Sequence, residues 1–167
     1  GYTPTSSEVE ELLQAIEEST KPMVIVLDEA YKGMEWESSS VQGSIAKSFG
    51  NLDPKQFLVV KVDGATKELF FFGGRIGFVT FLCNKKSAPV LEEKVIASIR
   101  STVSALPSPS QAMVLRALRS DTLQHEVGEI RGLLRRRYET LKRAMDERSV
   151  PYFPFNSAFF VLVRTPN

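Results

Sequence analysis

Two short runs of apolar, mostly β-branched residues place the tightest limit on the fold of this chain. Residues 23–27 (MVIVL) and 57–60 (FLVV) contain no polar side chain. Continuous runs of this length are typical of strands that are covered on both faces, as in sheets flanked by helices. The first run is followed by residues 28–29 (DE) and the second by residues 61–64 (KVDG), so each expected strand ends in ionisable groups.

Outside these two runs, apolar residues recur mostly at the spacing of a helix. Residues 5–8 (TSSE) have the spacing of a capping box, and an apolar helical face follows to residue 16. We expect a short helix over 45–49 and a third buried strand over 76–82. Apolar positions at steps of three and four predict further helices over residues 90–103, 111–118 and 123–145. The alternation of strands and helices favours an α/β fold, with a layered, mostly parallel sheet and flanking helices.

The second half of the chain changes character. One long amphipathic helix dominates residues 121–150, and two prolines follow at 151 and 154. Residues 158–163 (AFFVLV) then predict a strand with no evident partner within the sequence. We interpret residues 151–167 as the start of a second, smaller domain.

Composition narrows the function classes. The 167 residues carry 21 Lys and Arg against 20 Asp and Glu, and this balance gives no general attraction to nucleic acid or to an anionic membrane. No apolar run is long enough to span a bilayer. Cys83 is the one cysteine, and His125 has no second ligand at metal spacing, so we expect no metal site. These features predict a cytoplasmic protein.

Four side chains that can carry chemistry follow the expected strands. Asp28 and Tyr31 come after the first strand, Lys67 after the second, and Arg75 lies between glycines before the third. Ligands of open α/β sheets bind beyond the carboxyl ends of the strands. A lysine there can form an imine with a carbonyl group, and an arginine flanked by glycines suits a phosphate.

These residues stand in the motifs DEAY (28–31), DGATK (63–67) and GGRIG (73–77). In combination they resemble the class I/II aminotransferases, which are fold-type I enzymes that use pyridoxal 5'-phosphate (PLP). The resemblance covers nearly the whole chain. It implies that residues 1–120 belong to the PLP-binding large domain, that 121–150 form a connecting helix, and that 151–167 begin a truncated small domain.

The resemblance also implies a role for each residue. Lys67 would hold the cofactor as an internal aldimine and later move the substrate proton. Asp28 would form a salt bridge with the pyridine nitrogen, so that the ring can accept electrons. Tyr31 would donate a hydrogen bond to the phenolate oxygen of the ring.

Phosphate binding is the point at which the sequence departs from the family pattern. Arg75 would bind the phosphate. Many family members also place a serine three residues before the lysine, and here that position is Gly64. We expect the hydroxyl of Thr66 to serve instead.

The resemblance implies an aminotransferase that moves an amino group between an amino acid and a 2-oxo acid, as a homodimer when full length. Several family elements fall outside the 167 residues, so we expect the isolated chain to be inactive. Two alternatives stay open. One keeps PLP but changes the reaction, as in C–S lyases or cyclopropane-forming synthases, and the other is the aminotransferase-like sensor domain of a transcription regulator.

Overall fold

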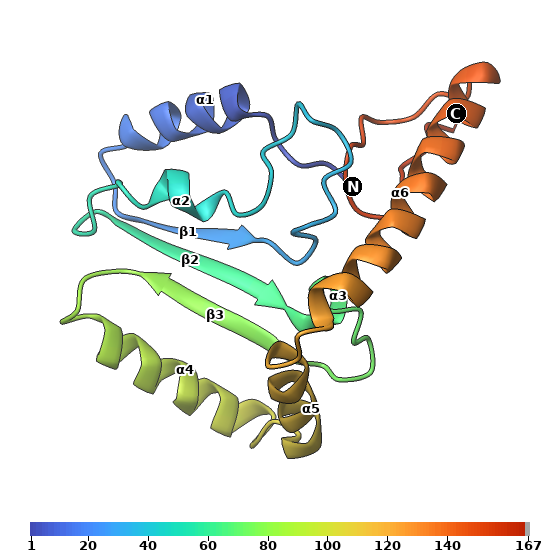
Figure 1. Cartoon of the computed structure of the whole chain (residues 1–167). Helices are drawn as coiled ribbons and strands as arrows, with labels where there is room; N and C mark the ends of the chain where they lie inside the picture. The colour runs from blue at the N-terminus through green and yellow to red at the C-terminus, as the bar shows by residue number, and fades with distance from the viewer. Residues whose placement is uncertain (166–167) are drawn as a thin grey trace.

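The computed structural model of the chain describes residues 1–165; residues 166–167 of the expected small domain lie outside the described part. A sheet in the order β1 (Met23–Asp28), β2 (Phe57–Gly64) and β3 (Gly77–Leu82) forms its centre (Figure 1). β1 and β2 are parallel, with Asp28 opposite Val62. β3 is antiparallel to β2.

The sheet is therefore mixed, whereas we expected a mostly parallel one. After Gly64 the chain forms a short helix and a turn that remain at the same end of the sheet, and β3 starts there with Gly77 opposite Gly64. A parallel third strand would need a longer crossover that returns the chain to the far end of the sheet.

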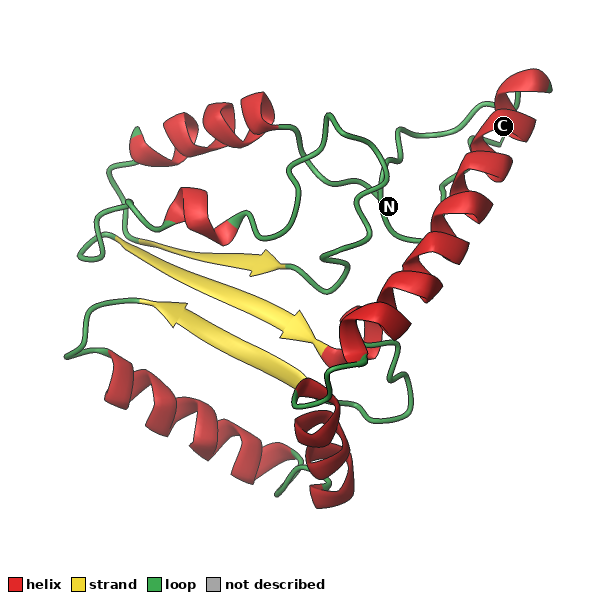
Figure 2. Ribbon diagram, in the orientation of Figure 1, coloured by secondary structure: helices red, strands yellow, loops and turns green. Residues whose placement is uncertain are grey.

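Figure 2 shows helices beside β1 and others beyond β3. The capping box is confirmed, because the Thr5 side chain accepts from the Glu8 amide and the Glu8 side chain accepts from the Thr5 amide. The helices are α1 (Ser6–Glu17), α2 (Ala46–Phe49), α3 (Ala65–Glu68), α4 (Ala88–Thr102), α5 (Ser108–Leu118) and α6 (Leu123–Glu147). Each expected helix is present, and α3 is an addition.

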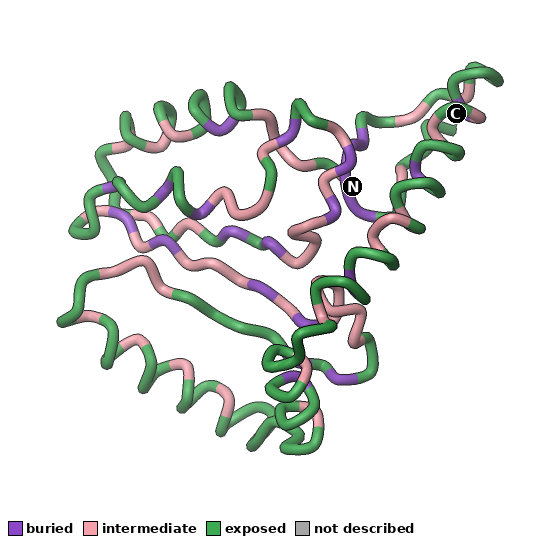
Figure 3. Tube along the Cα trace, in the orientation of Figure 1, coloured by how far each residue is buried: buried purple, intermediate pink, exposed green. Residues whose placement is uncertain are grey.

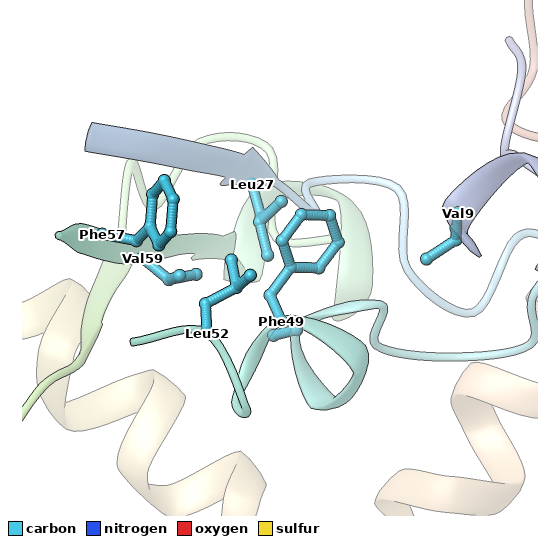
Figure 4. Close-up of a cluster of buried hydrophobic side chains, with 7 residues drawn as sticks. Val9, Leu27, Phe49, Leu52, Phe57 and Val59 are labelled. Atoms are coloured by element: carbon cyan, nitrogen blue, oxygen red, sulfur yellow. The ribbon is translucent and has the colours of Figure 1, made fainter. Parts of the chain in front are cut away.

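The main core lies between the sheet and the pair α1 and α2 (Figures 3 and 4). Phe49 of α2 is 1% exposed and meets the alternate residues of the strands that face it. These strand residues are Leu27, Phe57 and Val59, and the other buried members of the cluster are Val9, Ala46 and Leu52. Burial of this one face fixes the register of β1 and β2, since a shift by one residue would turn the apolar set outward.

The opposite face of β1 is open, which contradicts the expectation of a strand covered on both faces. Val24 and Val26 are 65% and 61% exposed. The run 23–27 is apolar at every position, so the sequence indicates two apolar faces, but among residues 1–165 helices cover only one. α4 has no buried residue, and α5 buries Val114 against Ala65 and Ile76 at the end of the sheet.

The expected strand over 158–163 is wrong. That segment forms one isolated bridge, Val163 with Tyr152, and a second bridge, Glu35 with Ser157, lies just before it. Ala158 has φ 61°, a left-handed conformation that interrupts an extended backbone. The segment has no neighbouring strand within the described residues and packs instead on α6 and the loop after β1.

A second core cluster holds α6 against that loop. Trp36 packs near Tyr138 of α6, with 6.3 Å between ring centroids, and its indole N–H donates to the Ala158 carbonyl. Burial and the hydrogen bond to Glu37 raise the pKa of Tyr138 to about 12. These contacts bring residues 155–160 to the end of the sheet where β1 and β2 terminate.

We expect Phe49→Ala to lower the free energy of unfolding by about 3–5 kcal/mol, because it empties a fully buried site in the main core. Urea unfolding of the 167-residue chain measures this change. Leu12→Ala is the control, since Leu12 is 49% exposed on α1 and its loss should cost below about 1 kcal/mol. Equal losses in the two variants would contradict this assignment of the core.

Candidate active site

The carboxyl ends of β1 and β2 meet at one edge of the sheet. Parallel pairing places Asp28, the last residue of β1, beside Val62 near the end of β2. The chain then turns directly into α3, which carries Lys67. The edge also receives the start of β3, because the Ala65 amide donates to the Ile76 carbonyl at 3.1 Å.

The amine of Lys67 lies among aromatic rings. Its Nζ is 5.6 Å from the ring centroid of Tyr31, 5.3 Å from that of Phe72 and 4.9 Å from that of Phe159. A cation over an aromatic face is attracted to it, by about 0.5–1 kcal/mol at exposed sites. The contacts direct the amine toward Tyr31 and away from the open surface on which most lysines lie.

Two hollows lie near Tyr31, which lines the smaller of them. One, of about 660 Å³, is lined by Lys67, by aromatic residues and by α6. The other, of about 200 Å³, is lined by Asp28 and Tyr31. Ala158 and Phe160 border both. The rings of Phe159 and Phe160 pack edge-on to Tyr31, at 5.5 and 5.4 Å between centroids.

Tyr31 therefore has Lys67 near one side and shares a hollow with Asp28. Asp28 is exposed, and its Oδ1 accepts from the Ala30 amide at 3.1 Å. Asp28 and Lys67 do not line one common hollow. Tyr31 and the 158–160 segment link them.

The two residues expected to bind the phosphate, Arg75 and Thr66, lie outside the linings of both hollows. Arg75 is exposed with φ 53°, and it lines neither of the two hollows. Within the described residues its guanidinium forms no hydrogen bond or ion pair. Thr66 precedes Lys67 in α3, is partly buried, and also lines neither hollow. Arg75 nevertheless directly precedes Ile76, whose carbonyl binds the first amide of α3.

A row of alternating charges at this edge was not predicted from the sequence. Lys61 contacts Glu29 at 3.8 Å and also pairs with Asp63. Lys32 contacts Asp63 at 2.8 Å and Glu68 at 3.1 Å. We call these five residues the ion row. The one signal in the sequence was the pair of charges two residues apart on β2, which places both on one face of the strand.

The pKa values in the ion row move in different directions. Burial alone would raise the pKa of Asp63, but hydrogen bonds from Lys32 and Lys61 outweigh it and lower that pKa. Burial, with the nearby charge of Asp63, raises the pKa of Glu68. Burial opposes the charge on Lys32, yet its bonds to the two carboxylates raise the Lys32 pKa. Near neutral pH, Lys32 is therefore a cation that is paired with the side chains of Asp63 and Glu68.

At this edge the amine of Lys67, the phenol of Tyr31 and the carboxylate of Asp28 follow one another in space. These three groups suit an aldehyde cofactor that has a basic ring nitrogen. The amine could bond covalently to the aldehyde, and the exposed Asp28 has room for a cationic partner. Among residues 1–165 no three metal-binding side chains come together, and no helix there has the length and apolarity needed to cross a membrane.

Comparison with solved structures shows the same fold in known enzymes. An aminotransferase from Anaerococcus prevotii matches with a TM-score of 0.88 and 21% identity, over 99% of this chain and 42% of that one. An aromatic aminotransferase from Pyrococcus horikoshii matches with a TM-score of 0.78 and 20% identity, over 96% and 40%. The aspartate aminotransferase of Thermotoga maritima gives 0.73 and 17%, over 100% and 40%. The chain spans about two-fifths of the length of these structures.

Comparison with curated proteins gives no match. The family description "Aminotransferase class I and II" matches residues 1–167, the whole chain. The backbone comparison shows a shared fold, and the family description, which covers the whole chain, shows the family. The chain belongs to the class I and II aminotransferase family.

Proposed function

We propose that this chain is part of an aminotransferase that moves an amino group between an amino acid and a 2-oxo acid, with Lys67 as the residue that binds PLP covalently. The observation that carries the proposal is the position of Lys67. Its amine leaves α3 at the carboxyl ends of β1 and β2 and lies 5.6 Å from the ring centroid of Tyr31, which shares a hollow with Asp28.

PLP, when bound, supplies an electron sink for the bonds at the substrate α-carbon. Three residues of this chain have the remaining roles. Lys67 attaches the cofactor and carries the proton at the α-carbon. Asp28 holds a proton on the ring nitrogen by its negative charge, and Tyr31 donates its hydroxyl proton in a hydrogen bond to the ring oxygen.

We also propose two phosphate contacts: the Arg75 guanidinium, which the family pattern implies, and the Thr66 hydroxyl in place of the family's serine. The ring of Phe71 packs against Gly74, whereas Arg75, the next residue, is exposed. The exposed guanidinium is free to take a bidentate partner, which is the geometry in which arginine binds phosphate best.

The division of the chain belongs to the same proposal. Residues 1–120 would lie in the cofactor-binding domain, 121–150 would form the connecting helix, and 151–167 would begin the small domain. The whole protein would act as a homodimer. The isolated chain would have little or no activity, because it spans about two-fifths of the matched structures.

Replacing Lys67 tests the catalytic assignment. In a protein in which this chain is continued to the length of its structural relatives, Lys67→Ala should lower amino transfer to an added 2-oxo acid by at least about a hundredfold, since the variant loses both the covalent anchor and the proton carrier. Lys85→Ala, at an exposed lysine, is the control and should keep the parent rate. A Lys67→Ala variant as active as the parent would refute the assignment. Formation of a 2-oxo acid without transfer to the acceptor would favour the lyase alternative.

Replacing Arg75 tests the phosphate assignment separately. Arg75→Ala should weaken PLP binding by about tenfold or more and leave the binding of pyridoxal, which has no phosphate, unchanged, because a charge-assisted hydrogen bond contributes about 1.5–3 kcal/mol. Equilibrium titration followed by absorbance measures both affinities. Arg135→Ala, which removes an exposed arginine on α6, serves as the control. Equal weakening for the two ligands would assign Arg75 a role other than phosphate binding.

A further inference from the structure

The ion row follows the proposed site residues along the chain. The residue directly after each of Asp28, Tyr31 and Lys67 is a member of the row. These neighbours are Glu29, Lys32 and Glu68. The loop after β1 and helix α3, which are separate in the sequence, are thus joined by charge next to the groups that line the hollows.

Lys32 is the link that reaches α3. Its Nζ lies 2.8 Å from Asp63 Oδ1 on β2 and 3.1 Å from Glu68 Oε2 on α3, and its own amide donates to the Glu29 carbonyl at 3.0 Å. Among the ion pairs of residues 1–165, this is the one that ties α3 to the rest of the protein. The other polar contact of Glu68 is long, with Arg131 donating to its carbonyl at 3.5 Å.

We propose that Lys32 is a positioning residue that holds α3, and with it the amine of Lys67, in place beside Tyr31. The catalytic meaning of this position rests on the proposed function, whereas the brace itself is a property of this chain. Lys32 borders the smaller hollow together with Asp28 and Tyr31, but its ammonium group is paired with Asp63 and Glu68, and it acts on Lys67 through these two carboxylates.

α3 needs such a brace for two reasons. It has four residues, and a helix of one turn is not stable by itself. In addition, Asp63 and Glu68 are both partly buried carboxylates, and without Lys32 they would repel each other across the turn that starts α3. Glu68 Oε1 is buried without a hydrogen-bond partner, so among residues 1–165 Lys32 provides the one ion pair of the Glu68 side chain.

Buried ion pairs of this kind contribute little net stability, because the charges lose hydration, but they can fix one arrangement. The raised pKa of Glu68 agrees with this view, since it means that burial outweighs the attraction of Lys32. A raised carboxyl pKa gives stability that is full below the unfolded pKa and is lost as the pH rises through the folded one. Lys32 therefore sets where α3 lies more than how stable the fold is.

The first test is amide hydrogen exchange of the 167-residue chain with Lys32→Met, Lys32→Arg and Lys85→Met. The amides of Leu69 and Phe71 donate to the Ala65 carbonyl and report whether α3 keeps its place. We expect their exchange to rise by about tenfold in Lys32→Met, as expected for the loss of charged hydrogen bonds, and to stay near the parent value in the other two variants. Amides of β1 should not change in any variant. Unchanged exchange at Leu69 and Phe71 in Lys32→Met would overturn the brace.

The second test measures the reactivity of the Lys67 amine without any cofactor. A small acylating reagent with mass mapping gives its rate relative to exposed Lys85 in the same sample. We expect Lys67 to react more slowly than Lys85 in the parent, and severalfold faster than in the parent when Lys32 is Met. Adding Glu68→Gln to Lys32→Met should restore part of the parent rate, because it removes the repulsion. An acylation rate of Lys67 that is the same in the parent and in Lys32→Met would overturn the positioning role. Neither hydrogen exchange nor acylation depends on PLP binding or on amino transfer.

Discussion

Parallel pairing of β1 and β2 is the constraint on which the candidate site depends. It places Asp28 beside Val62, so that two chain segments leave the sheet at the same edge. The pairing is itself set by one buried face, on which Phe49 packs against alternate strand residues. A shift of register by one residue would turn those apolar side chains outward and would move Asp28 away from α3. Core and site are thus fixed by the same alignment.

The sheet brings the site residues to one edge, and ion pairs then fix the position of α3 at that edge. The ion row crosses from β1 through β2 to α3, and each of its two lysines is shared by two carboxylates. Aromatic contacts act from the other side, where Tyr31 meets Phe159 and Phe160. Lys67 is held between these two sets of contacts, with charges behind α3 and rings in front of its amine.

Local features were predictable from the sequence and long-range ones were not. The capping box of Thr5 and Glu8 depends on residues three apart, and the structure confirms it. The exposure of Val24 was missed because an apolar run shows what a strand could bury and does not show which elements are present to cover it. The contact of Lys32 with Asp63 joins residues far apart in the chain, and no spacing rule predicts such a pair.

In the candidate site, too, the local features were predicted and the long-range contacts were not. The motifs placed Asp28, Tyr31 and Lys67 at strand ends, which the sheet brings to one edge. The same motifs gave no sign that the 158–160 segment would border both hollows, since a left-handed Ala158 in place of a strand depends on packing against α6 and the loop after β1. The roles of these residues in cofactor chemistry stay predictions until a bound cofactor is located.

Borohydride reduction after incubation with PLP, followed by peptide mass mapping, tests the central claim most directly. The reagent makes the bond between a lysine amine and the cofactor permanent and so records which amine formed it. The account predicts one stoichiometric pyridoxyl group, on the peptide that contains Lys67. An adduct on a different lysine, or none on a folded protein, would contradict it.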